Sequence, residues 1–413
     1  MRRLRDNLKT NLLVGLLLLV IMPSQAKDRL NDYLSKGQYE EGIAYYTKKV
    51  KRKRPKPQYT FALGFLHFID GVENLMQGFY KYGLNSETGQ QLSIPFLRLP
   101  VPPNPKPEKV TGDQVRRLLD EFYRKMALVD SVLGTISNKK FKTKVNLGYI
   151  RMDYDANGKI EQEEYFHVVY TFYNRNAQKF FKKEIPFPIQ FDNGDAYWLR
   201  GYANLLMGLV DFFLTFDGSP IFEYGGHMFF KNADTPYQKL INSELENSRR
   251  NRDSQFLDII AMIHAFRLKP IAPQRSQRAR KHLLKVIELS KKTWKLIEAE
   301  KDNDLEWLPN AKQTSVTETK ITQEMITGWH EFLEEATLIL DGKKLIAHWR
   351  IEDKGINLKK FFNNPPVLDP IMIVHGAGII PYLEKGTFTS KNTWRRLQTI
   401  FRGDFIGFAI WIN

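Results

Sequence analysis

Apolar residues recur every three or four positions in several long stretches of this chain, and this spacing is typical of one face of an α-helix. One stretch begins after Asp113, which we expect to cap the helix, and another begins at the turn of residues 192–195. A third ends at Asp341-Gly342. The apolar positions of the three stretches are Val115, Leu118, Leu119, Phe122, Met126, Val129 and Val132; Trp198, Tyr202, Leu205, Leu206, Leu209, Phe213 and Phe216; and Met325, Trp329, Phe332, Leu333, Ala336, Ile339 and Leu340.

Residues 28–82, 256–266 and 282–297 are also predicted to be helical. The helix that follows residue 192 is apolar on its other face too, so we expect it to be central and nearly enclosed. Strand-like alternation is confined to short segments, chiefly 140–149 and 345–350, and Gly225-Gly226-His227 is expected to form a loop. The predicted fold class is therefore mainly α, a helical array or bundle with a few short strands.

Prolines divide the chain. Residues 83–113 contain six of them within thirteen positions and are predicted to form a long extended connection. We expect a helical region at 27–82 before it and the main helical body at 114–413 after it. At 387 residues without its first 26, the chain is long enough for two domains or one large array. The six prolines are Pro95, Pro100, Pro102, Pro103, Pro105 and Pro107.

The first helical region carries Gly37-Gln38-Tyr39-Glu40-Glu41-Gly42-Ile43-Ala44-Tyr45-Tyr46, and Ala62-Leu63-Gly64 follows it. This segment resembles the second helix of a tetratricopeptide repeat and the start of the next repeat. Such arrays need about three stacked units, and the sequence holds no second clear copy. A single helical hairpin packed on the main body is the favoured interpretation.

Residues 153–164 combine residue type and spacing in a way that indicates one chemistry. Calcium takes oxygen ligands, and a twelve-residue loop supplies them from positions 1, 3, 5, 7, 9 and 12, with a glycine at the sharp turn of position 6. Gly158 occupies position 6, and Ile160 at position 8 is the expected apolar anchor. The ligand positions hold Asp153, Asp155, Asn157, Lys159 (through its backbone carbonyl), Glu161 and Glu164.

The segment resembles an EF-hand calcium-binding loop, which implies a bound Ca²⁺ closed off by both oxygens of Glu164. The resemblance covers the loop and a predicted exit helix at 162–173, whereas a strand precedes the loop. No second loop of this kind follows in the sequence, so a solitary structural site is expected instead of a sensor pair. The alternative is an acidic turn that caps a helix. Asp302-Asn303-Asp304-Leu305-Glu306 is also rich in oxygen ligands but lacks the turning glycine.

The N-terminus predicts export. Basic residues precede an apolar run at 12–22, and small residues end at Ala26, which is typical of a signal peptide at 1–26. An uncleaved anchor is the alternative. The absence of cysteine excludes disulfides and a thiolate nucleophile and suits a bacterial periplasm, with the extracellular space as the alternative.

Removal of residues 1–26 takes away four basic residues and one acidic residue, which lowers the formal charge from +16 to +13. This charge favours an anionic envelope polymer or protein as partner, and export argues against nucleic acid. The basic stretch 48–56 and the basic face of 275–295 are the candidate contacts, although each is also a candidate for a merely solvated surface. No membrane span is expected after cleavage.

Enzyme signatures are weak. The sequence lacks the paired-histidine spacing of a zinc protease. His375-Gly376-Ala377-Gly378 resembles the oxyanion-hole glycines of lipases, but the Gly-x-Ser-x-Gly turn that would carry the nucleophilic serine is absent. No catalytic or organic-cofactor residues are therefore assigned. We therefore expect a non-catalytic, calcium-binding scaffold or binding protein of the cell envelope. The alternative is a hydrolase or lyase acting on envelope polymer through Asp192, Asp195 and Asp217, although helix caps and salt bridges are the favoured explanation of these residues.

Overall fold

A computed structural model describes residues 29–91, 96–97, 99–136, 140–159, 161, 164–165, 186–237, 251–401 and 408–409. In this part of the chain the protein is mainly α-helical, with short antiparallel strands in two small sheets, as the sequence predicts. The predicted signal peptide and exit helix lie outside the described residues, apart from 164 and 165 of the latter.

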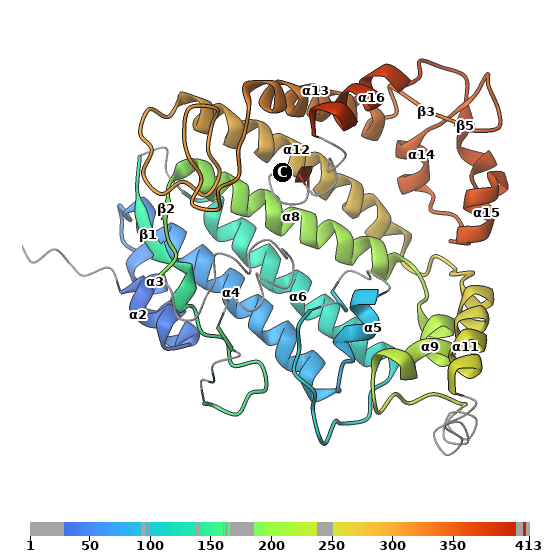
Figure 1. The fold of residues 1–413 in the computed structure, drawn as a ribbon, viewed down its shortest axis with the longest axis horizontal. Helices are drawn as coiled ribbons and strands as arrows, with labels where there is room; N and C mark the ends of the chain where they lie inside the picture. The colour runs from blue at the N-terminus through green and yellow to red at the C-terminus, as the bar shows by residue number, and fades with distance from the viewer. Residues whose placement is uncertain are drawn as a thin grey trace, which may run out of the picture.

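Four long helices form the centre of the molecule and run side by side with a similar tilt (Figure 1). Their order in space is α4, α6, α8 and α12, because α4 packs on α6, α6 on α8 and α8 on α12. The second predicted helix, α8, is therefore central, as expected. These helices are α4 (Pro57–Lys81), α6 (Gly112–Leu133), α8 (Asn193–Thr215) and α12 (Pro273–Ala299).

Glycines set how closely α4 and α6 approach. Gly64, Gly71 and Gly78 recur every seven residues on α4 and face α6. A Cβ atom at Gly64 would lie 2.4 Å from Leu133, and one at Gly78 would lie 2.4 Å from Leu118. These distances leave no room for a side chain, so the two helices pack backbone against side chain along their length.

The N-terminal helices share the core of this bundle. Helix α3 packs against α4, which gives the expected hairpin, but α4 itself is buried on most of its surface. Apolar residues of α2, α3, α4, α6 and α8 form one continuous cluster with those of the first sheet. In its described residues, the Pro-rich connection contains one short helix, α5. The bounds here are α2 (Leu30–Ser35), α3 (Tyr39–Val50) and α5 (Ser86–Gln91).

The first sheet is a two-stranded antiparallel ribbon of β1 (Thr143–Asn146) and β2 (Pro188–Phe191), in which Val145 faces Ile189. The predicted strand before the acidic loop is therefore confirmed over four residues, and the 3₁₀-helix η1 (Leu147–Tyr149) replaces its end. Val145 and Ile189 are fully buried, so the ribbon packs one face on the bundle.

Helices α13 and α16 lie above α12 in Figure 1, and α9, α11, α14 and α15 lie toward its right-hand side. Helix α11 packs on α9, and α13 packs on α12 and α16. Strands β3, β4 and β5 pair in that order in the second antiparallel sheet, so only two residues of the predicted strand 345–350 form one. The bounds are α9 (Ser219–Phe229), α11 (Asn251–Ala265), α13 (Gln323–Leu340), β3 (Ile346–Ala347), β4 (Gly355–Ile356), α14 (Leu358–Asn363), α15 (Pro370–His375), η4 (Ala377–Tyr382), β5 (Leu383–Glu384) and α16 (Lys391–Ile400).

Two local predictions are wrong. Gly225-Gly226-His227 lies inside α9, not in a loop. Gly225 gives α11 room, because a Cβ there would lie 2.8 Å from the sulfur of Met262. Helix α6 is capped by Thr111 and not by Asp113, since the Thr111 side chain accepts from the Gln114 N–H and the Gln114 side chain binds back to Thr111.

Candidate metal centre

The acidic loop is shaped by its own aspartates. The two carboxylate oxygens of Asp153 accept from the backbone N–H groups of Asn157 (3.1 Å) and Gly158 (2.9 Å). Asp155 accepts from the same Asn157 N–H at 3.0 Å. The chain turns through left-handed conformations at Ala156 (φ +57°) and Gly158 (φ +72°). A Cβ at Gly158 would meet nothing within 4 Å, so the backbone angle and not crowding favours glycine here.

Glu164 joins the end of the loop to its beginning. One carboxylate oxygen accepts from the Tyr154 N–H (2.9 Å) and the other accepts from the Glu161 N–H (2.8 Å). The Met152 N–H donates to the Glu164 carbonyl at 2.8 Å, and Arg151 and Tyr165 form an antiparallel bridge. The two ends of the loop are thus held together by backbone hydrogen bonds.

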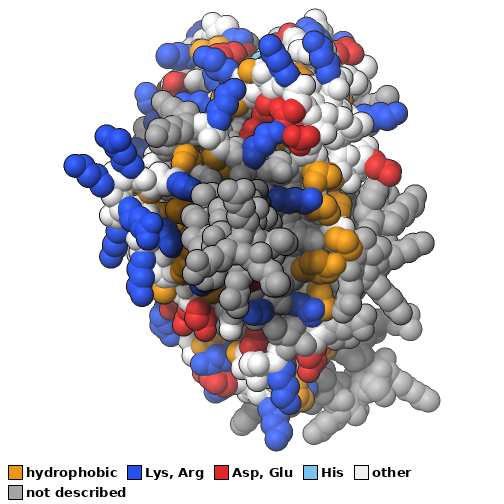
Figure 2. Space-filling view, turned by 90° about the vertical axis from the view of Figure 1, so that its left-hand side faces the viewer, with side chains coloured by type: hydrophobic (Ala, Val, Ile, Leu, Met, Phe, Trp, Pro, Cys, Tyr) orange, Lys and Arg blue, Asp and Glu red, His pale blue; other side chains and the backbone are white. Residues whose placement is uncertain are grey.

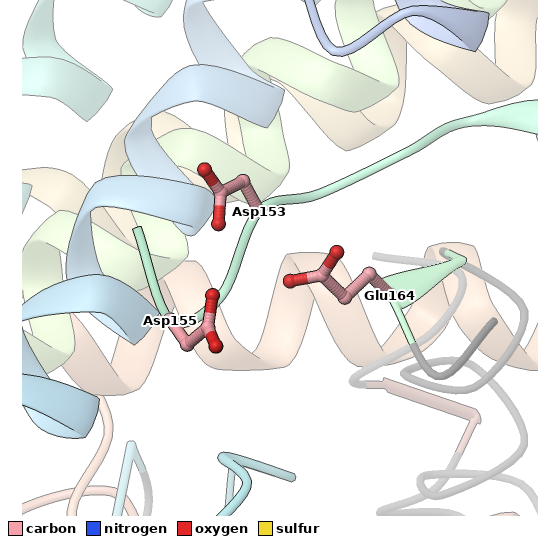
Figure 3. Close-up of side chains that lie close together, drawn as sticks. All are labelled: Asp153, Asp155 and Glu164. Carbon is pink, nitrogen blue, oxygen red and sulfur yellow. The ribbon is translucent and has the colours of Figure 1, made fainter. Parts of the chain in front are cut away.

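Three carboxylates converge inside the loop. Figure 3 shows Asp153, Asp155 and Glu164 pointing toward one another from its two ends. One oxygen from each lies within 4.8 Å of the others. Ligands on opposite sides of one calcium ion are about 4.6–5.2 Å apart, since each Ca–O distance is about 2.3–2.6 Å. These three side chains are therefore spaced so that a single metal ion could contact all of them.

The other predicted ligand residues are not part of this carboxylate cluster. The Asn157 side chain is turned into the loop: its oxygen accepts from the Lys159 N–H (2.6 Å) and its nitrogen donates to Asp155 (2.9 Å). Lys159 is exposed, as expected if only its backbone carbonyl is used, and Glu161 is exposed as well. Position 9 of such loops often acts through water. Ile160 lies outside the described residues.

Helix α4 supports the loop through two side chains that the sequence did not mark as part of the site. Glu73 accepts from the Asp153 N–H (2.9 Å), and Gln77 donates to the Asp153 carbonyl (2.7 Å). The signal was available: Glu73 and Gln77 stand four residues apart on a largely apolar helix. These two bonds fix the first ligand position against the most buried helix of the bundle.

The electrostatic environment of the site is strongly negative. Burial, together with the neighbouring charges of Asp153, Asp70 and Glu164, raises the pKa of Glu73 to about 8, against the opposing effect of its hydrogen bond from the Asp153 N–H. Burial and the charges of Asp153 and Asp155 also raise the pKa of Glu164. A bound cation would offset this accumulation of negative charge.

Of the aspartates considered for catalysis, Asp192 and Asp195 cap a helix. Asp192 accepts from the Gly194 N–H (2.6 Å), and Asp195 accepts from the Asp192 N–H (2.9 Å), which together make a capping box at the start of α8. Asp217 lies beyond the other end of α8 and accepts from the Ser219 N–H (3.0 Å). A helix of 23 residues is about 35 Å long, so Asp217 cannot act on the same bond as the other two.

A second group of carboxylates gathers at the start of α8. Burial raises the pKa of Asp192 and Asp195, and burial together with the charge of Asp192 raises the pKa of Glu300 to about 8. Nearby, Asp302 and Asp304, which the sequence suggested as a weaker calcium site, both bind Lys142, with a distance of 2.9 Å for Asp304. A lysine ammonium thus already occupies the position between these two aspartates.

The basic face of α12 is partly turned inward. Asp211 on α8 is fully buried and accepts from Arg275 (3.0 Å) and from Arg278 (2.8 and 3.0 Å). Arg280 donates to the Leu340 carbonyl at 2.9 Å. These arginines therefore bind acceptors contributed by α8 and by the end of α13. Exposed basic residues of this helix include Lys281 and Lys295.

Fold and loop together define a mainly α-helical protein with a carboxylate cluster that could hold a metal ion. Comparison with protein families, with curated proteins and with solved structures finds no significant match. Within the described part of the chain, none of the helices combines the length and the apolar character that crossing a bilayer requires.

Proposed function

We propose that this is an exported calcium-binding protein in which one EF-hand-type site serves a structural role. The supporting observation is the convergence of Asp153, Asp155 and Glu164 within 4.8 Å in a loop whose remaining positions match the calcium pattern. Oxygen donors without nitrogen or sulfur suit a hard cation such as calcium.

A bound calcium ion would hold three parts of the molecule together. Asp153 and Asp155 follow η1, Glu164 closes the loop, and α4 holds Asp153 through Glu73 and Gln77. Because the ligands are gathered only in the folded chain, binding energy adds to the free energy of unfolding. At a free calcium concentration about 100 times the Kd, this contribution is about 2.7 kcal/mol. Extracellular sites work with Kd values of ~10⁻⁴ to 10⁻³ M, which suits an exported protein.

An anionic polymer or protein of the envelope is the proposed partner. Figure 2 shows Lys and Arg side chains spread over the face that includes α2, α3 and the β1–β2 ribbon, with Asp and Glu in smaller groups. The connection between α3 and α4 contributes exposed cations to the surface: Lys51, Arg52, Lys53, Arg54 and Lys56. This loop is a better candidate than α12, whose arginines are engaged with Asp211 and with α13.

The test is thermal unfolding in millimolar calcium, in millimolar magnesium and in chelator. We expect calcium to raise the Tm, magnesium to raise it less, and Asp153→Ala to remove the difference. Asp304→Ala is the matched control, because Asp304 is an exposed aspartate bound to Lys142 and should leave the calcium response unchanged. An equal Tm in calcium and chelator for the unsubstituted protein would reject the proposal.

A further inference from the structure

Helix α11 is apolar on the side that faces away from the protein. Its inner side packs on α9, where Asp258 pairs with His227 (2.9 Å) and Met262 packs against Gly225. At 100° per residue, Phe256, Ile260 and Ile263 point the opposite way. Phe256 is 64% exposed and the adjacent Leu257 is 62% exposed. The outer face of a solvated helix is normally polar, so this face lacks the residues that water would favour.

Helix α15 shows the same feature. Ile371 is 60% exposed, Val374 is 75% exposed, and Met372 between them is exposed too. Trp349 is another exposed apolar side chain, and it lies beside Gly376 at the end of the helix, where a Cβ would be 3.7 Å from its ring. Several large apolar side chains therefore protrude from one short helix and its flank.

The two helices are joined into one surface. Leu268 and Leu368 exchange backbone hydrogen bonds of 3.0 and 2.9 Å, and Arg267 pairs with Asp369 at 3.4 Å. Leu268 follows α11 by three residues and Leu368 precedes α15 by two, and both helices lie at the right-hand side of Figure 1. The α11–α15 surface is defined as the exposed residues Phe256, Leu257, Ile260, Ile263, Ile271, Val367, Ile371, Met372 and Val374.

The exposed charges beside this surface are mainly positive. Residues 256–272 and 366–382 contain two acids, Asp258 and Asp369, and each is ion-paired, while the first turn of α11 adds one base, Arg252, and one acid, Asp253. Lys269, between the two helices, is exposed, and the side chain of Arg267 is 75% exposed despite its pair. Both cations lie in the segment that follows α11, so they flank the exposed apolar side chains of the two helices. Apolar side chains flanked by cations suit contact with an anionic lipid surface. The basic character of the whole chain adds a long-range attraction of the same sign.

We propose that the α11–α15 surface docks on a bilayer containing anionic phospholipids. Phe256, Leu257 and Ile371 enter the boundary between head groups and acyl chains, and Lys269 stays at the level of the phosphates. The contact is peripheral. This inference is independent of the calcium site, which lies on other elements.

The experiment is co-sedimentation of the full chain with vesicles of phosphatidylcholine alone or of phosphatidylcholine with phosphatidylglycerol, in chelator. We expect binding to the mixed vesicles that weakens as salt is raised. Phe256→Gln and Ile371→Gln should each lower the partition coefficient about tenfold, because each withdraws a large apolar side chain from the interface. Lys269→Gln should lower it about fivefold, and only on the anionic vesicles.

The matched control is Leu128→Gln, which removes a 47% exposed leucine from α6 without touching the α11–α15 surface. All variants carry the same N-terminal segment, so a difference in binding between them is due to the substituted residue. Equal binding of Phe256→Gln, Ile371→Gln and the unsubstituted protein would overturn the proposal. So would a dimer in sedimentation equilibrium that these two substitutions dissociate while neither vesicle type binds, because a second copy would then cover the surface.

Discussion

Asp155→Asn should change the stability of the protein in opposite directions with and without calcium. The substitution keeps the size of the side chain and an oxygen that can accept from the Asn157 N–H, but it removes one of three clustered charges. In chelator it relieves repulsion from Asp153 and Glu164. In calcium it removes a charged ligand. The two effects have separate physical causes and can be measured in one protein.

The size of the first effect follows from the geometry. Two unit charges 4.8 Å apart repel by about 0.9 kcal/mol in water and by about 3.5 kcal/mol at an effective dielectric constant of 20. Asp155 is partly exposed, so the lower value is the better guide for each of its two neighbours. We therefore expect Asp155→Asn to raise the free energy of unfolding by ~1–2 kcal/mol in chelator, at a pH of about 8 and low salt.

The second effect is larger and of opposite sign. Saturating calcium is expected to contribute about 2.7 kcal/mol to the unsubstituted protein and little to the variant. Urea unfolding followed by fluorescence, in chelator and in calcium, measures both. Stabilisation in chelator without a loss in calcium would show that the charges cluster but bind no ion. Destabilisation in both solutions would refute the reasoning about repulsion.

Other predictions concern the bundle and the loop. Asp211→Ala should lower the free energy of unfolding by about 3–5 kcal/mol in urea titrations, because it leaves two arginines without their buried partner, and a loss below ~1 kcal/mol would contradict this. Gly158→Ala should lower the free energy of unfolding by about 1 kcal/mol, because Gly158 has a positive φ. Gly218→Ala is the control and should leave the stability unchanged, because Gly218 also has open space around it but has φ −85°. Equal effects of the two substitutions would contradict the role assigned to the positive φ. Glu300 has a folded pKa of about 8, above its unfolded value near 4.5, so its contribution is full below about pH 4.5 and is lost as the pH rises to about 8. Because Glu300 is partly exposed, we expect the stability difference between the unsubstituted protein and Glu300→Gln to change by only ~1–2 kcal/mol over that range, and a flat difference would contradict the assigned pKa.

Helical periodicity predicted the parts of the fold that depend on a single apolar stripe. Helices α6 and α13 form where the apolar spacing predicts them. A segment with a single apolar stripe at helical spacing can bury that stripe only as a helix, whichever element it packs against. The central position of α8 followed from its second apolar face. In these cases the information lies within the segment itself.

Features that depend on a distant partner could not be predicted in this way. The glycines at 225 and 226 read as a loop because the sulfur of Met262, which fills the space beside Gly225, comes from another helix. The basic residues of α12 read as a solvated or docking face because Asp211, which binds Arg275 and Arg278, lies on α8.

In the candidate site, too, only the local features could be predicted from the sequence. The ligand pattern at 153–164 is local and could be read directly. Its attachment to α4 is not local, since Glu73 lies 80 residues before Asp153. The residues of the loop specify the turn, and the packing of the bundle decides what the loop is held against.

Calorimetric titration of calcium into the purified protein tests the central claim most directly. We predict one ion bound per chain with a Kd of ~10⁻³ M or tighter, which is the range of extracellular sites. Asp153→Ala should abolish this binding. Absence of binding at millimolar calcium, or binding that persists unchanged in the variant, would contradict the account.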